Sequence, residues 1–298
     1  MIIWSNSLKS INKLMDSNKF INFELSTWEQ FNRRIKETDK TLRSSFYKIF
    51  NTHNAAIIAS GSYGRGDLCL HSDLDIILLQ ERKFYPSSDW TQLIYTITER
   101  KTSIQFIFLD ECLHPQLWPI HLWYHLLSAR YICGNIFFWK YLKNCFSSSI
   151  QSMTTTEVLN LKSLDMSRSI KDGIPSEPHY YSIKTGNGCI IDCQFASILK
   201  IWLSSRRSLT AREEELFTIN SNSLRYLVLL KEYMHHKGRG PLESFDFLYN
   251  NFLGRVLFFY SPLFHPYRIE QIRSKNIQAI HTIIQSLLYE DPLCLTRF

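Results

Sequence analysis

The chain has 298 residues, which is enough for about two domains of ordinary size. Hydrophobic residues make up 45% of it and charged residues 20%, a balance that excludes an intrinsically disordered chain. The net charge of +7 favours anionic partners, but Lys and Arg are dispersed along the sequence, so the charge alone does not indicate nucleic acid.

The sequence indicates neither a membrane protein nor a secreted protein. It has no run of about 18 apolar residues, the length that a membrane-spanning helix needs. The first ten residues, MIIWSNSLKS, lack the long apolar segment and the cleavage site of a signal peptide. The seven cysteines are odd in number and scattered, so we expect reduced thiols, no structural zinc and a cytoplasmic location.

The first part of the chain predicts a helix followed by a small sheet. Apolar residues at three- and four-residue steps predict a helix over residues 26–50, which begins at a capping box formed by Ser26 and Glu29. Three short apolar runs predict buried strands, with a helix over residues 90–99 between the second and the third. These runs are AAIIAS (55–60), LDIILL (74–79) and TSIQFIFL (102–109).

The second part of the chain predicts helices only. From about residue 115 onwards, apolar residues recur at helical spacing, and Pro and Gly separate the periodic segments. We therefore predict an α+β protein with a small mixed sheet in residues 1–114 and an all-helical domain in residues 115–298. The expected helices cover residues 120–133, 137–146, 158–171, 192–204, 222–235 and 269–288.

The stretch GSYGRGDLCLHSDLD, from Gly61 to Asp75, combines a glycine-rich loop with two carboxylates. Asp73 and Asp75 lie at the start of a predicted strand, so both point to one face, about 6.5–7 Å apart along the chain. Paired carboxylates are ligands that Mg²⁺ prefers, together with phosphate oxygens of a substrate. The loop exposes backbone N–H groups to a polyphosphate, and Arg65 adds a guanidinium for a bidentate phosphate contact.

Each half of this pattern also has an ordinary structural explanation. A D-x-D pair alone is most often a strand-edge or turn feature, and a glycine loop alone is most often a tight turn. Tyr63, within the loop, either stacks on a base or supports the turn. In the order strand, loop and S-D-L-D, however, the pattern predicts a site that holds an NTP with Mg²⁺ for an in-line displacement.

The pattern resembles the nucleotidyltransferase superfamily, and GSYGRGDL…SDLDI is similar to the G-G-Y-G-R-G-E-L…S-D-I-D signature of PII-protein uridylyltransferases. Later segments resemble the same family in the same order, over about residues 25–255 in all. The segment IKTGNGCIIDCQ is also shared in outline with glutamine-synthetase adenylyltransferases. The matching segments are LDECLHP and LLSARYICGN within 109–135, IKTGNGCIIDCQ (183–194) and LRYLVLLKEYMHHKGRGPLESFDF (224–247).

This resemblance implies a polymerase-like palm followed by a helical domain that closes over the nucleotide. It assigns Asp73 and Asp75 as the catalytic Mg²⁺ ligands, with Mn²⁺ as an alternative metal. It assigns Gly61, Ser62 and Arg65 to the triphosphate of the NTP.

From the helical domain, the resemblance places four further residues in the same cleft. From the residues alone, Lys184 lies in a glycine-containing turn ahead of a helix, which is either an anion site or an ordinary loop with a solvated lysine. The four residues are Lys184, Gly186, Gly188 and Asp192.

The chain departs from the family at three points. The third metal-binding carboxylate that many nucleotidyltransferases carry on the next strand is Gln105 here, and an amide is a poor metal ligand. Ile191 replaces the family's arginine, and Cys189 replaces its second glycine. The chain has no His-Asp dipeptide, so we expect it to lack the hydrolase domain and the deuridylylating activity of the full-length relatives.

The leading interpretation is a Mg²⁺-dependent nucleotidyltransferase that moves UMP or AMP from an NTP to a hydroxyl and releases pyrophosphate. By the resemblance, the acceptor is a side chain of a target protein, such as a tyrosine of a regulatory protein. One alternative is transfer to RNA or to a small molecule, which the net charge suits. Another is a catalytically weak nucleotide-binding regulatory protein, which Gln105 and Ile191 suggest.

Overall fold

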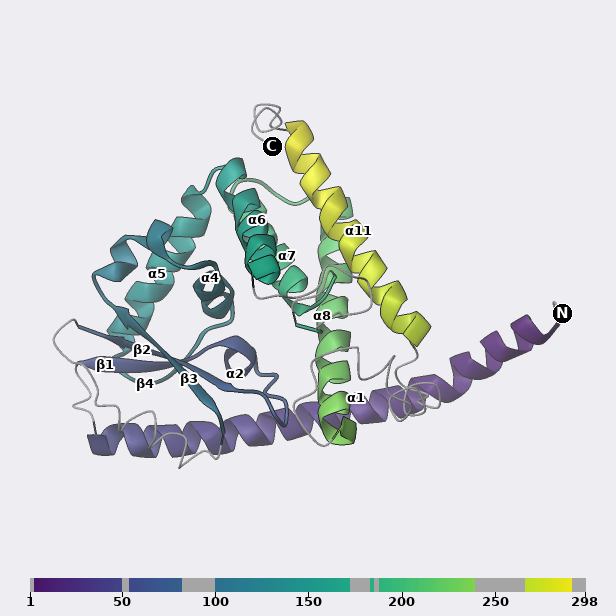
Figure 1. Ribbon diagram of the computed structural model, residues 1–298, viewed down its shortest axis with the longest axis horizontal. Coiled ribbons are helices and arrows are strands. Elements are labelled where there is room, and N and C mark those ends of the chain that lie inside the picture. The colour runs from purple at the N-terminus through teal and green to yellow at the C-terminus, as the bar shows by residue number, and fades with distance from the viewer. Residues whose placement is uncertain are drawn as a thin grey trace.

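The structure is an α+β fold in which a four-stranded mixed sheet lies between one long helix and a group of shorter helices (Figure 1). The predicted fold class is therefore confirmed. This computed structural model describes residues 3–49, 54–81, 100–171, 183–184, 188–238 and 266–290.

The strands follow the order β3-β2-β1-β4 across the sheet. β1 is antiparallel to both β2 and β4, whereas β2 and β3 are parallel. Three of the strands occupy the three predicted apolar runs, and the helix expected over residues 90–99 lies outside the described residues. The strands are β1 (Ala55–Ala59), β2 (Leu74–Gln80), β3 (Thr102–Phe108) and β4 (Arg130–Gly134).

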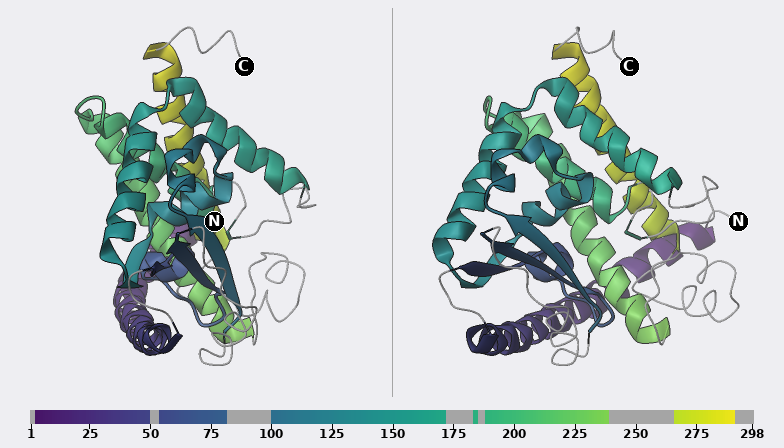
Figure 2. Two further views of the ribbon diagram at one scale, coloured as in Figure 1. Left: turned by 90° about the vertical axis from the view of Figure 1, so that its left-hand side faces the viewer. Right: turned by 60° about the vertical axis from the view of Figure 1, so that its left-hand side comes forward.

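Helix α1 (Ile3–Ile49) covers one face of the sheet, as Figures 1 and 2 show. Its Leu42 and Phe46 are buried in one cluster with Leu74 and Ile76 of β2. Because α1 begins far upstream of residue 26, the predicted capping box is wrong: Ser26 donates a hydrogen bond to the carbonyl of Phe23 inside the helix. The preceding turn already satisfies the backbone N–H groups that a cap would bind.

The opposite face of the sheet packs against the remaining helices. Ile77 and Leu79 of β2 belong to a cluster that includes Trp123 of α4 and Phe195 of α7. Both faces of β2 are thus buried, which explains why its sequence is a continuous apolar run and does not alternate.

The helix predicted over residues 120–133 is wrong in its second part. The helical stretch α4 ends at Leu127, and residues 130–134 form strand β4 beside β1. Pairing with β4 satisfies the second edge of β1, a long-range contact that local apolar spacing does not reveal. The sheet therefore includes residues from both predicted domains, 1–114 and 115–298.

Helices form at the other predicted places, although α8 begins at Ala211, eleven residues before the predicted start at residue 222. Helix α7 is central, because it is buried along most of its length and contacts α4, α5, α6, α8 and α11. Two short 3-10 helices, Glu111–Leu113 and Pro115–Leu117, connect β3 to α4. The longer helices are α4 (Ile120–Leu127), α5 (Ile136–Ser152), α6 (Thr155–Lys171), α7 (Ile190–Ser204), α8 (Ala211–Gly238) and α11 (Pro266–Glu290).

Within the described residues, no helix has both the length and the apolar character that crossing a membrane requires.

Candidate active site

The glycine loop forms a short helix, α2 (Gly61–Arg65), directly after β1. Gly61 has a φ of +56°, and a Cβ on it would overlap Oδ2 of Asp75 and lie 3.0 Å from its Cγ. Only glycine lets the backbone of the loop pass this close to the carboxylate. The Ser60 N–H donates to the Asp75 carbonyl at 3.0 Å, which fixes the loop against β2. The two parts of the sequence motif therefore lie in direct contact.

Asp73 and Asp75 lie at the start of β2, in register with the face that turns toward the helices. The side chain of Asp73 is 50% exposed, and its ion pair with Lys101, at 3.9 Å between Nζ and Oδ2, is open to solvent. Asp75 is partly buried, and burial raises its pKa, as does the charge of Asp73. The nearby cations Lys184, Arg65 and Lys231 lower the same pKa, so Asp75 lies among positive charges.

One solvent-open pocket, with a cavity volume of about 130 Å³, lies between the sheet and the helices. Of the nine residues predicted for the site, six line it: Gly61, Ser62, Arg65, Asp73, Asp75 and Lys184. The further lining residues are Asp67, Cys69, Ser72, His121, Tyr124, His125, Ile190, Ile191, Gln194, Val228 and Lys231.

The remaining predicted residues do not line this pocket in the described part of the chain. Asp192 is buried at the start of α7, where it accepts a hydrogen bond from the Gly188 N–H at 2.7 Å and pairs with Lys162. It therefore orders the turn that carries Lys184. Gly186 lies outside the described residues.

Arg65 lines the pocket but is engaged by a neighbouring carboxylate. Its Nε and Nη2 atoms donate to the two oxygens of Asp67 at 2.9 and 3.1 Å. Its guanidinium is thereby held in one orientation beside the glycine loop.

Tyr63 supports the loop and does not reach the pocket. Its side chain is fully buried, and its hydroxyl donates to Asp39 of α1. Arg130 of β4 binds the same carboxylate at 2.6 and 3.0 Å and lies over the Tyr63 ring. Of the two sequence interpretations of Tyr63, support of the turn is therefore the one that this packing favours.

Among the pocket residues that sequence reasoning missed are three basic side chains from the helices. Lys231 of α8 is only 8% exposed, and a single lysine in an amphipathic helix gave no signal of its own. His121 and His125 of α4 lie four residues apart, so both are on one face of the helix. Their spacing was the only available signal.

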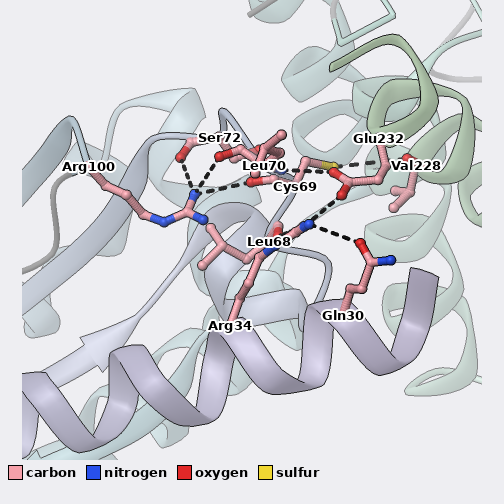
Figure 3. A network of polar contacts seen from close by, with 9 residues as sticks. All are labelled: Gln30, Arg34, Leu68, Cys69, Leu70, Ser72, Arg100, Val228 and Glu232. Atoms are coloured by element: carbon pink, nitrogen blue, oxygen red, sulfur yellow. Dashed lines mark hydrogen bonds and ion pairs between the residues drawn. The ribbon is translucent and has the colours of Figure 1, made fainter. Parts of the chain in front are cut away.

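A polar network ties the segment between the glycine loop and Asp73 to helices from both ends of the chain (Figure 3). Glu232 of α8 is fully buried; it accepts from the Leu70 N–H at 2.8 Å and pairs with Arg34 of α1 at 2.7 Å. Arg100 donates to the carbonyls of Cys69, Leu70 and Ser72 at 3.1–3.2 Å. Glu232 directly follows Lys231, so this network anchors the part of α8 that carries Lys231.

The strand next to Asp75 contributes no carboxylate to the pocket. The register of β2 and β3 places Ser103 beside Asp75 and Gln105 beside Ile77. Gln105 lines a different pocket, next to the two 3-10 helices. Among the residues that the structure describes, no group of three or more His, Cys, Asp or Glu side chains is placed to hold a metal. A cation here would depend on Asp73, Asp75 and the substrate.

No protein-family model matches the chain. One similar solved structure is described as the crystal structure of a toxin-antitoxin with AMP-PNP. That chain is 13% identical, the match covers 46% of this chain and 98% of that one, and the TM-score is 0.28. A likeness at this TM-score carries no argument about fold or function.

Proposed function

We propose that this chain is a Mg²⁺-dependent nucleotidyltransferase that transfers UMP or AMP from an NTP to an acceptor hydroxyl and releases pyrophosphate. The observation that carries this proposal is the composition of the pocket. Two carboxylates and a glycine loop from the sheet share one cavity with two lysines from the helical half. Carboxylates suit a hard cation and lysines suit phosphate oxygens, so the pocket fits a metal-bound triphosphate better than a neutral ligand.

Asp73 and Asp75 are the residues that would hold the metal. They supply oxygen ligands only, which both Mg²⁺ and Mn²⁺ accept, and the substrate phosphates would complete the coordination. Burial raises the pKa of Asp75, and a cation bound beside it would favour the ionised carboxylate. When bound, the metal would neutralise the negative charge that develops on the transferred phosphate and on the leaving pyrophosphate.

Lys184 and Lys231 are the residues that would bind the phosphate chain from the helical side. Both lower the pKa of Asp75, which places their charges near its carboxylate. The carbonyl of Lys184 accepts from the Ile191 N–H at 3.0 Å, so the first turn of α7 fixes its backbone. Lys231 is buried, and Coulomb attraction to a phosphate is stronger in such a medium than in water. The loop residues Gly61 and Ser62 would contact the same phosphates.

A protein hydroxyl is the proposed acceptor, because the sequence motifs resemble enzymes that modify regulatory proteins. We test the proposal by incubating the purified protein with cell lysate, Mg²⁺ and each of the four α-³²P-labelled NTPs. We expect label on one protein band with UTP or ATP, and loss of that label in Asp73→Asn. Asp110→Asn is the matched control, because Asp110 is an exposed carboxylate that lines a different pocket.

The other outcomes of this experiment separate the alternatives. Label in RNA or in a small molecule would replace the protein acceptor but keep the transfer reaction. If no label is incorporated with Mg²⁺ or Mn²⁺ while the NTP still binds, the catalytically weak regulatory protein is the better description. An Asp73→Asn variant as active as the wild type would contradict the proposed site.

A further inference from the structure

The two histidines of α4 are the part of the pocket to which the proposed function gives no role. His121 and His125 lie one turn apart, with ring centroids 6.0 Å from each other, and both line the pocket that contains Asp73 and Asp75. His121 is exposed and His125 is partly buried. His121 is therefore the more solvent-accessible of the two imidazoles.

The packing of α4 against the core determines which face of this helix lines the pocket. Leu122, Trp123 and Leu126 are at most 5% exposed and belong to the core. His121, His125 and Ser128 follow one another at steps of four and three residues and so form the opposite stripe of the helix. Rotating α4 about its axis would move the histidines away from the pocket but would also expose these core residues. The helix therefore keeps the histidines on the pocket side.

The end of α4 is also held directly against the glycine loop. Ser128 Oγ donates to the Gly61 carbonyl at 3.4 Å. A Cβ on Gly64 would lie only 2.5 Å from the Ser128 carbonyl oxygen, so the two backbones are in close contact. His125 precedes Ser128 by three residues, and it is thereby tied to the loop that we propose binds the triphosphate.

Several acidic groups of the pocket are unsuited to accepting a proton from an acceptor hydroxyl. Both oxygens of Asp67 are bound by Arg65. Burial raises the pKa of the Cys69 thiol far above its ordinary value, so it stays protonated. Asp73 and Asp75 are assigned to the metal. His121 and His125 line the same pocket, and imidazole is the side chain whose basicity suits proton transfer near neutral pH.

The charged groups around His125 come from several elements. The charged residues that share its pocket are Arg65 and Asp67 beside α2, Asp73 and Asp75 at β2, Lys184 before α7 and Lys231 on α8. Helix α6, which also packs against α4, brings Lys162, and this residue is paired with Asp192.

We propose that His125 is the general base of the transfer reaction, an inference that rests on the proposed function. The neutral imidazole takes the proton of the acceptor hydroxyl as its O–H bond breaks. The acceptor oxygen forms a bond to the α-phosphorus, and the bond between the α-phosphorus and the bridging oxygen breaks. Its electron pair leaves with the pyrophosphate, and the imidazolium later returns its proton to solvent.

Chemical rescue tests this assignment. We expect His125→Ala to lower kcat for transfer about 10²–10⁴-fold, the usual contribution of a general base, with little change in KM for the NTP. Added imidazole should restore the rate in a concentration-dependent manner. His281→Ala is the control, because His281 is exposed on α11 and does not line the pocket. Asp73→Asn should be inactive with or without imidazole.

The alternatives lead to different results. A His125→Ala protein with the wild-type rate would show that His125 has no role in the transfer. A loss that imidazole does not restore would assign His125 to structure or binding, provided that circular dichroism shows a folded variant at the assay temperature. Should the variant be unfolded there, the same measurements on His125→Asn decide. An inactive wild-type protein would contradict the proposed function itself, and the general base with it.

Discussion

At the residue scale, the close contact between the glycine loop and Asp75 is the feature on which the site depends most. Gly61 combines a positive φ with a backbone that nearly touches the carboxylate, whereas Gly66 has a φ of +90° and a Cβ on it would make only an ordinary contact with Ile35 at 4.0 Å. An alanine at Gly61 would therefore suffer both backbone strain and overlap with Asp75, whereas an alanine at Gly66 would suffer backbone strain only. A carboxylate displaced at Asp75 would lose a ligand position for the metal.

We expect Gly61→Ala to weaken Mn²⁺ binding at least tenfold, because the new Cβ forces the Asp75 carboxylate to move. Gly66→Ala introduces similar strain, about 1–2 kcal/mol, without contact to the site. Calorimetric Mn²⁺ titrations of both variants, with urea unfolding as a second measurement, check this. Equal Mn²⁺ affinities in the two variants would contradict the role given to the contact.

At this scale, sequence reasoning predicted which residues of a local motif lie together, and it missed contacts between residues far apart in the chain. Gly61, Asp73 and Asp75 are contiguous in one motif, and the structure brings them into one pocket. Asp192 was expected there too, but it turns to Lys162, thirty positions away, which no local pattern indicates. Lys231 was missed for the same reason: its neighbours in the pocket come from other segments.

At the scale of single elements, the helix caps show how a signature can mislead. Ser26-x-x-Glu29 has the capping-box pattern but lies inside α1, whereas Thr210-x-x-Glu213 forms a capping box at the start of α8. The Thr210 N–H donates to Glu213 at 2.8 Å, and the Glu213 N–H donates to Thr210 Oγ1 at 3.2 Å. Only the knowledge of where a helix begins separates the two cases.

The α8 cap leads to a prediction about stability and pH. Hydrogen bonds from Arg207, and further ones from Thr210, hold the pKa of Glu213 at about 2, below its ordinary value of 4.5. A lowered folded pKa stabilises the protein above the unfolded value, and this contribution is lost as the pH falls from about 4.5 to about 2. Because Arg207 is one-third exposed, we expect Glu213→Gln to cost about 2 kcal/mol at pH 7.

Urea unfolding of wild type and Glu213→Gln between pH 7 and pH 2 measures this effect. The difference in unfolding free energy should shrink toward low pH, where the wild-type carboxyl becomes protonated. Glu157→Gln, at the similar but more exposed cap of α6, is the control and should have a smaller effect. A Glu213→Gln difference that is independent of pH would contradict the account.

At the scale of the whole molecule, the sheet and the helices form one structure because the chain crosses between them repeatedly. Strand β4 comes from beyond residue 114, and α1 contacts both β4 and α8. The sequence predicted the fold class and most elements, since these follow from local periodicity. It missed β4, whose pairing with β1 joins residues far apart in the chain.

The ion pair of Arg34 with Glu232 is a direct test of this connection. Glu232 is fully buried, so Arg34→Met removes the positive charge paired with its carboxylate and leaves the negative charge buried. We expect this to lower the free energy of unfolding by about 3–5 kcal/mol. Arg33→Met, at the exposed neighbouring position, should change the unfolding free energy little. We expect Arg34→Met to lower the midpoint of a single unfolding transition. Two separate transitions in the wild type would contradict a cooperative unit.

The central claim is that one pocket, built from both halves of the chain, holds a metal-bound triphosphate. Calorimetric titration with Mg²⁺ and a non-hydrolysable NTP analogue tests it most directly, in wild type, Asp75→Asn and Lys231→Met, with Lys200→Met, an exposed lysine outside the pocket, as control. We predict Mg²⁺-dependent binding in wild type and control, and at least a tenfold weaker affinity in each of the two pocket variants. Unchanged affinity in Asp75→Asn and Lys231→Met, or binding that needs no Mg²⁺, would contradict the claim.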